Sequence, residues 1–323
     1  AATCSEDGNK EYWTCEHCGK YFLSDDANPE TAKAVELSET ITPALNHKNA
    51  ITRGASEPTE TAPGYSGDRY CPDCDTVFEK GYTYWNEDNL TWKLYEDGTL
   101  TISGTGAMKD YDYDSNPSPV YKNSDVKKVV IEDGVTSIGI RAFNACRNLT
   151  NITIPDNVTS IGDFAFYYCE NLTSVTIPNS VTSIGNSVFE NCIALTNITI
   201  PDSITSIGDF AFRYCTSLTS IMIPDSVTSI GNAAFESCKG LTSITIPDSV
   251  TSIGAYAFKN CSSLTSITIP DSVTSIGYEA FDSCSNLKTI SLSCKSSLKK
   301  SDFGEQANLV SYTSHTLKLS LIH

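Results

Sequence analysis

Cysteine and histidine are the side chains of this sequence best suited to chemistry, and the cysteines fall into separate groups. Five of the thirteen cysteines precede the regular repeats described below, and four of these form two CxxC pairs. Three thiolates and an imidazole suit tetrahedral zinc. One candidate zinc set is therefore Cys4, Cys15, Cys18 and His47, and the alternative set is Cys15, Cys18, Cys71 and Cys74. Small exported modules with little core often form disulfides instead, so structural zinc and disulfides remain alternatives.

Seven other cysteines recur at one constant interval along the sequence, and an eighth, Cys294, follows them out of phase. The regular set comprises Cys146, Cys169, Cys192, Cys215, Cys238, Cys261 and Cys284. Free cysteine commonly serves as a small buried hydrophobe. A disulfide between neighbours would require Cα atoms within about 7 Å. The outer side of a curved solenoid is expected to hold them further apart, so we expect this column to consist of buried thiols.

Catalytic chemistry has little support in the sequence. The four histidines, at positions 17, 47, 315 and 323, lie outside the regular repeats, and none has a serine or cysteine partner at a recognisable spacing. There is neither an HExxH motif nor a glycine-rich phosphate loop opening a helix. We therefore expect a protein that is not an enzyme.

The elements that must position any functional side chain come from one 23-residue repeat, written seven times between residues 126 and 286. A clear copy is LTSITIPDSVTSIGAYAFKNCSS, residues 241–263. Alternation around Ile244 predicts a short strand, Gly254 is expected to permit a sharp corner, and Ala257, Phe258 and Cys261 predict a helical or 3₁₀ turn. One unit cannot bury its own apolar edge, so the copies must stack into a solenoid, with one strand expected per coil.

The pattern LxxIxIPxSVxxIGxxAFxxC resembles the BspA-like (Treponema pallidum-type) leucine-rich repeats of bacterial surface proteins, and the N-terminal cysteine region resembles small modules that flank such repeats in gut Firmicutes. The resemblance implies a mostly β, α/β solenoid, a right-handed horseshoe of 23-residue coils. It also implies a secreted or cell-surface protein that adheres to a host extracellular-matrix protein, another cell-surface protein or a glycan.

Four regions follow from these patterns. Residues 1–83 hold the cysteine-containing modules, with the aromatic hairpin candidates GNKEYWTCEHCGKYF (8–22) and GYSGDRYCPDCDTVF (64–78) on either side of a Thr/Pro-rich linker. Residues 84–125 are expected to form a β-hairpin cap that turns at Asp97-Gly98. Residues 126–286 contain the seven repeats, and residues 287–323 form a degenerate terminal coil, with a strand at 309–312, and a tail.

The variable residues of the repeat mark the candidate partner-binding surface. Strand positions carry mainly Thr and Ser, whereas aromatic residues collect on the outer turn. Protein hot spots favour Trp, Tyr and Arg. We therefore predict a partner site at Phe164, Tyr167, Tyr168, Phe210, Arg213, Tyr214 and Tyr256, with packing between coils as the plainer alternative.

Charge and hydropathy narrow the partners further. The net charge of −17 disfavours nucleic acid, and no apolar run is long enough to insert into a membrane. We expect a monomer whose partner is a protein or glycan. The alternative is a purely structural spacer that presents other domains at the cell surface, which the uniform Thr and Ser strand positions favour.

Overall fold

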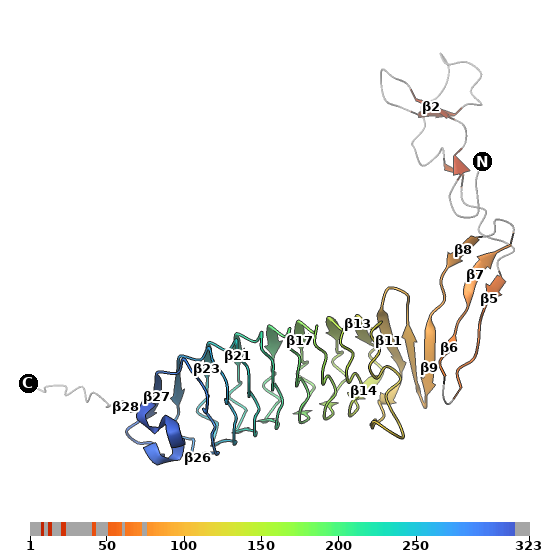
Figure 1. The fold of residues 1–323 in the computed structure, drawn as a ribbon. Helices are drawn as coiled ribbons and strands as arrows, with labels where there is room; N and C mark the ends of the chain where they lie inside the picture. The colour runs from red at the N-terminus through yellow and green to blue at the C-terminus, as the bar shows by residue number, and fades with distance from the viewer. Residues whose placement is uncertain are drawn as a thin grey trace, which may run out of the picture. The chain divides into compact units, whose positions relative to one another are not determined.

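The computed structural model describes residues 8–9, 12–14, 21–23, 41–42, 51–59, 62–72 and 76–313 (Figure 1). The chain divides into two compact units, Ala1–Tyr84 and Trp85–His323. The strands that begin in the first unit are β1 (Gly8–Asn9), β2 (Tyr12–Thr14), β3 (Tyr21–Leu23), β4 (Ile41–Thr42), β5 (Ile51–Arg53), β6 (Gly64–Tyr65), β7 (Asp68–Cys71), β8 (Thr76–Glu79) and β9 (Thr83–Glu87).

Two short antiparallel pairs in the first unit coincide with the predicted hairpins. Strand β2 pairs with β3, and β7 pairs with β8 so that Cys71 lies opposite Thr76. The residues between the strands of each pair that complete the CxxC motifs, 15–18 and 73–74, lie outside the described residues, so the predicted turn at each motif stays a prediction.

The second unit begins with the predicted hairpin cap. Strands β10 (Leu90–Leu94) and β11 (Thr99–Gly104) are antiparallel, and Gly98 adopts φ 87° in the turn between them. Trp92 is completely buried, with its ring 5.8 Å from that of Phe143 in the first coil. The cap therefore closes the apolar interior, which would otherwise face water.

Each coil contributes two short parallel strands, so the prediction of one strand per coil is wrong. After β12 (Gly106–Ala107), the first strand of each coil is β13 (Lys128–Ile131), β15 (Asn151–Thr153), β17 (Ser174–Thr176), β19 (Asn197–Thr199), β21 (Ser220–Met222), β23 (Ser243–Thr245), β25 (Ser266–Ile269) and β27 (Thr289–Ser293). The second is β14 (Val135–Ile138), β16 (Ser160–Ile161), β18 (Ser183–Ile184), β20 (Ser206–Ile207), β22 (Ser229–Ile230), β24 (Ser252–Ile253) and β26 (Ser275–Ile276). Paired residues occupy the same position of successive repeats, as in Ser174↔Asn197.

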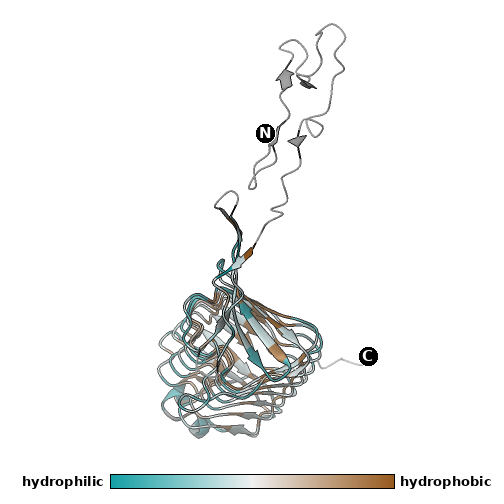
Figure 2. Ribbon diagram, turned by 90° about the vertical axis from the view of Figure 1, so that its right-hand side faces the viewer, coloured by the Kyte–Doolittle hydropathy of each residue, from teal (hydrophilic) through white to brown (hydrophobic). Residues whose placement is uncertain are grey.

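The coils, which Figure 2 shows one behind another, share one apolar interior. The phenylalanines of the repeat, from Phe143 to Phe281, are buried, and their rings are stacked with centroids 5.3 to 5.7 Å apart. The regular cysteines are buried free thiols, as predicted. Each Sγ donates to a phenylalanine carbonyl of the preceding coil in the copies after the first, for example from Cys215 to Phe189 at 3.2 Å.

The outer turn is a run of β-turns and not the predicted helical or 3₁₀ turn. In one coil, Tyr256 and Asn260 both have φ 60°, which a right-handed helix cannot accommodate. Alternate amides bond within the coil and to the next coil: Lys259 N–H donates to Tyr256 O, whereas Phe258 N–H donates to Ala280 O at 2.8 Å. This pattern satisfies the backbone N–H and C=O groups of the turn with hydrogen bonds, although no helix forms.

Gly254 has a different role from the predicted corner. Its φ is not positive, but a Cβ at this position would lie 2.6 Å from the backbone nitrogen of Asn232 in the preceding coil. The repeated glycine therefore allows close approach between coils.

The last coil ends in β27, the 3₁₀ helix η1 (Lys300–Leu309) and β28 (Val310–Thr313). Strand β28 matches the predicted terminal strand, and it pairs in parallel with β27. Phe303 of η1 is buried 6.2 Å from the ring of Phe281, so it closes the other end of the interior. No helix within the described part of the chain has the length and apolarity needed to cross a bilayer.

Candidate binding surface on the outer turn

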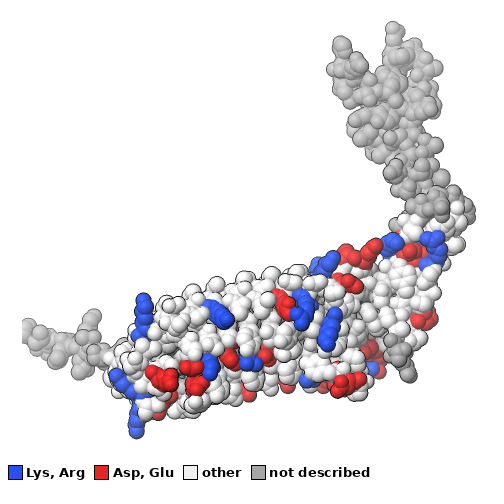
Figure 3. Space-filling model, in the orientation of Figure 1, with Lys and Arg blue, Asp and Glu red and all other residues white. Residues whose placement is uncertain are grey.

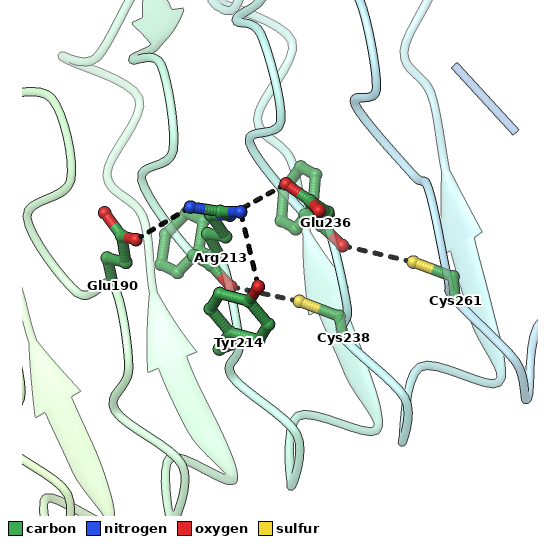
Figure 4. A network of polar contacts seen from close by, with 8 residues as sticks. Glu190, Arg213, Tyr214, Glu236, Cys238 and Cys261 are labelled. Atoms are coloured by element: carbon green, nitrogen blue, oxygen red, sulfur yellow. Dashed lines mark hydrogen bonds and ion pairs between the residues drawn. The ribbon is translucent and has the colours of Figure 1, made fainter. Parts of the chain in front are cut away.

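The outer turn carries a row of alternating charges at one position of the repeat. In successive coils this position holds Glu190, Arg213, Glu236, Lys259 and Asp282. Arg213 lies between its two acidic neighbours: its Nη1 donates to Glu190 at 3.3 Å and its Nε donates to Glu236 at 2.7 Å (Figure 4). Alternating red and blue side chains along the solenoid are visible in Figure 3. Neighbouring coils are therefore linked by ion pairs across the turn.

Glu190 is the most buried carboxylate of this network, with a side chain only 9% exposed. Burial raises the pKa of Glu190, and hydrogen bonds from Ser187 and Arg213 oppose this shift only in part. The charge on Glu190 is therefore costly to keep in the folded state, and it depends on Arg213.

Aromatic rings lie beside these charges. The Arg213 guanidinium carbon is 5.5 Å from the ring centroid of Phe210 and 4.7 Å from that of Tyr214. Two coils further on, Lys259 Nζ is 5.0 Å from the Tyr256 ring and donates to Glu279 at 2.6 Å. The hydrogen bond to Glu279 is the main reason that the pKa of Lys259 is raised.

A third group lies in the first two coils and the cap. Phe164 is in edge contact with Tyr167, which in turn contacts Tyr168. The Arg141 guanidinium carbon is 4.7 Å from the ring centroids of both Phe164 and Tyr113. Burial is the main cause that raises the pKa of Tyr167 to about 12.

The seven predicted partner-binding residues thus fall into three groups along one side of the solenoid. The structure brings Phe164 together with Tyr167 and Tyr168, and Phe210 together with Arg213 and Tyr214, while Tyr256 lies beside Tyr278. Most of these side chains are partly buried, and Phe210 is 36% exposed. The residues make the inter-coil contacts foreseen by the plainer alternative and still present surface to solvent.

Sequence reasoning missed the charged residues that hold these rings, namely Arg141, Glu190, Glu236 and Lys259. For Glu190, Glu236 and Lys259 the signal was the change of charge sign at a single position from coil to coil, whereas Arg141 occupies the repeat position of Phe164 and carried no such signal. It also missed a side-chain ladder on the same turn, in which each oxygen accepts the amide of the next coil. This ladder runs from Asp163 to Asn186 (2.7 Å), to Asp209 (2.9 Å), to Asn232 (2.6 Å) and to Ala255 (2.9 Å).

The face made by the first strands is chemically plain by comparison. From β15 to β27 its outward side chains are Thr, Ser and Asn, with the exception of Met222, which is 83% exposed; the first strand, β13, instead presents Lys128 and Val130. A shallow hollow of about 570 Å³ surrounds this methionine, between Asp202 and Thr245. No aromatic side chain lines the hollow, so the outer turn remains the stronger candidate for recognition.

The candidate zinc ligands Cys4, Cys15, Cys18, His47 and Cys74 lie outside the described residues, and the structure gives only the backbone of Cys71. Zinc at these positions stays a prediction. Among the described residues, no three His, Cys, Asp or Glu side chains gather in a way that could hold a metal ion.

The stacked two-strand coils define the class of this protein: it is a leucine-rich repeat solenoid. The profile described as "BspA type Leucine rich repeat region (6 copies)" matches residues 117–241 and 205–319. These ranges span more than half of the 323 residues, and the chain belongs to the BspA-type leucine-rich repeat family.

Three solved structures are similar to this chain in sequence. A leucine-rich repeat protein from Eubacterium ventriosum is 28% identical over 66% of this chain and 72% of its own, with a TM-score of 0.37. The T. pallidum leucine-rich repeat protein is 26% identical over 63% and 90%, with a TM-score of 0.43. A leucine-rich cell surface protein from Faecalibacterium prausnitzii is 24% identical over 71% and 94%, with a TM-score of 0.33. No curated protein matches the chain.

Proposed function

We propose that this protein is a secreted or cell-surface adhesin without enzymatic activity, which binds a host extracellular-matrix protein, another cell-surface protein or a glycan through the outer turns of its solenoid. The observation that carries the proposal is the concentration of aromatic and charged side chains on that turn, beside a strand face of short polar residues. Aromatic residues and arginine dominate the binding energy of protein interfaces.

The charged residues support binding because they fix the rings in advance. Arg213 is held by Glu190 and Glu236 while it contacts Phe210 and Tyr214. Side chains that are already ordered lose less conformational entropy when a partner arrives. The surface is therefore rigid before binding, as recognition by a stiff solenoid requires.

The proposal can be tested by binding to immobilised matrix proteins, cell-surface proteins and glycans. The test variant replaces Phe164, Tyr168, Phe210 and Tyr214 with alanine. A matched control replaces four exposed strand residues, Thr176, Thr199, Met222 and Thr245, with alanine. We expect the first variant to lose binding and the control to retain it. Equal binding by the two variants would place recognition elsewhere.

A structural spacer is the second candidate function, and one observation favours it. From β15 to β27 the outward strand positions keep nearly the same short polar side chains, with Met222 as the exception, which suits a rod that contacts nothing along that face. A chain that binds no member of the panel, although its far-ultraviolet spectrum and cooperative melting show that it is folded, would favour the spacer.

A further inference from the structure

The outer turns carry a second period, of two coils, superimposed on the 23-residue repeat. At the position of Phe164, alternate coils bear an aromatic ring, which is provided by Phe210 two coils later and by Tyr256 two coils after that. The coils between them carry Ser187 and Ala233 at the same position. A row of rings therefore runs along the solenoid at every second coil.

The fold does not require rings at this position. All five residues adopt the left-handed conformation, with φ between 51° and 60°. Bulky side chains are poorly tolerated there, and the coils of Ser187 and Ala233 make the same turn without a ring. Retaining Phe164, Phe210 and Tyr256 at strained positions points to a role in binding.

Each ring is held in place by one cation. The guanidinium or ammonium group lies 4.7 Å from the centroid for Arg141 and Phe164, 5.5 Å for Arg213 and Phe210, and 5.0 Å for Lys259 and Tyr256. Cation–π contact fixes the ring before a ligand arrives. The three rings therefore form a preformed, linear array.

The spacing of this array matches one kind of polymer. Rings of the buried phenylalanine column, which adjoins this turn, are 5.3 to 5.7 Å apart from coil to coil. This step is slightly longer than the usual separation of paired strands. Two coils therefore span about 11 Å, which is twice the step. This is close to the length of one disaccharide unit in an extended β-1,4-linked glycan. The apolar C–H face of a sugar ring packs on the electron-rich face of an aromatic ring, so every second sugar would meet a ring.

The charges around the rings select a neutral chain. Three cations, Arg141, Arg213 and Lys259, contact the rings, and four carboxylates, Glu190, Glu236, Glu279 and Asp282, pair with the last two, in a protein whose net charge is −17. A sulfated or uronic-acid polymer would be repelled. The carboxylates and the hydroxyl groups of Tyr168 and Tyr214 can instead hydrogen-bond sugar hydroxyls, and so fix the chain on the rings.

We infer that Phe164, Phe210 and Tyr256 bind a neutral, extended β-1,4-linked polysaccharide that runs along the solenoid, with one ring for each disaccharide. The inference rests on the proposed function, because it names the partner of the same surface. A protein that docks on the same turns is the competing outcome.

The first test is a length series measured by titration calorimetry. Neutral β-1,4-linked oligomers of glucose, mannose and N-acetylglucosamine are compared at two, four and six units. Each added disaccharide engages one more ring, so we expect affinity to rise by up to about tenfold per step. An affinity that does not change between two and six units would overturn the inference, as would tighter binding of uronic-acid oligomers.

The second test asks whether binding depends on the spacing of the rings. Tyr256→Ala removes one ring, whereas Tyr256→Ala with Ala233→Tyr moves the ring by one coil and keeps the composition. We expect both variants to bind the six-unit oligomer about tenfold more weakly than the unchanged protein, while Met222→Ala binds normally. Full affinity in the moved-ring variant would overturn the inference. Melting temperatures confirm that each variant is folded.

The two proposals can fail separately. If a matrix or surface protein binds and is lost in the fourfold alanine variant, while no oligosaccharide binds, the polysaccharide inference is wrong and the adhesin proposal stands. If neither protein nor glycan binds, both are wrong.

Discussion

Replacing Arg213 with alanine tests whether the charge row holds neighbouring coils together. The substitution leaves Glu190 and Glu236, whose side chains are 9% and 14% exposed, without their shared cation. Breaking a fully buried ion pair costs about 3–5 kcal/mol. Because Arg213 is 28% exposed, solvent screens part of this loss, and we expect a decrease of about 2 kcal/mol in the free energy of unfolding.

The pH dependence of this loss follows from Glu190. Burial already raises its pKa, and Arg213 opposes the shift, so Arg213→Ala raises it further. A carboxyl group whose pKa is higher in the folded than in the unfolded state binds protons more tightly when folded. The amount by which it lowers the free energy of unfolding is therefore largest when the pH is above the folded pKa. This loss disappears as the pH falls below the unfolded pKa. The variant should therefore lose more stability at pH 8 than at pH 5.

Urea unfolding and thermal melting, both followed by circular dichroism, measure the size of the loss and its pH dependence. For a unit of this size we expect a fall in melting temperature of about 4–8 °C at pH 8. Arg147→Ala is a matched control, since its ion pair with Glu170 is more exposed and should contribute less than about 1 kcal/mol. Adding Glu190→Gln to Arg213→Ala should restore part of the stability. An equal loss in both arginine variants, or at both pH values, would refute the reasoning.

Three further predictions concern the interior and the turns. Phe212→Ala should lower the free energy of unfolding in urea by about 3–5 kcal/mol, because its ring is buried between two others; a loss below about 1 kcal/mol would contradict a shared core. The regular cysteines should react with a chromogenic disulfide reagent only after denaturation. Burial is the main cause that raises the pKa of Cys146 and Cys238 to about 12. Reaction of these thiols in the folded protein would show that the interior opens to solvent. Ala233→Gly should stabilise the protein by about 1 kcal/mol by relieving a positive φ. Gly254→Ala should destabilise it, because the added methyl group would force two coils apart. A lower melting temperature for Ala233→Gly than for Gly254→Ala would exclude this account.

Repetition made much of the fold predictable from the sequence. Phe143 and Cys146 each recur at the fixed step of the repeat. The burial of each series in its own column could therefore be inferred without knowing the conformation of any single turn. The cap was predictable for a different reason, since Asp97-Gly98 between alternating apolar residues is a local hairpin signal. Both features depend on patterns that can be read directly along the chain.

Other features depend on contacts between coils, and the sequence pattern did not reveal them. The second strand of each coil is only two to four residues long and exists because its neighbours pair with it. The positive φ of Tyr256 is likewise imposed by amides that bond to the next coil, against the preference of the residue. The pairing of Arg213 with Glu190 and Glu236 requires knowing that equivalent residues of successive repeats lie side by side.

The Asp and Asn ladder constrains how such a chain can change length. Asp163 and Asp209 are separated by Asn186, so each carboxylate has an uncharged neighbour. Deleting the single coil of residues 172–194 would bring these two carboxylates side by side and would place Phe164 next to Phe210. Removing or duplicating two coils together preserves both the alternation and the ring spacing. Viable insertions and deletions in this solenoid should therefore add or remove two coils at a time. The pair of coils, and not the single repeat, is then the unit by which such a chain lengthens or shortens during evolution.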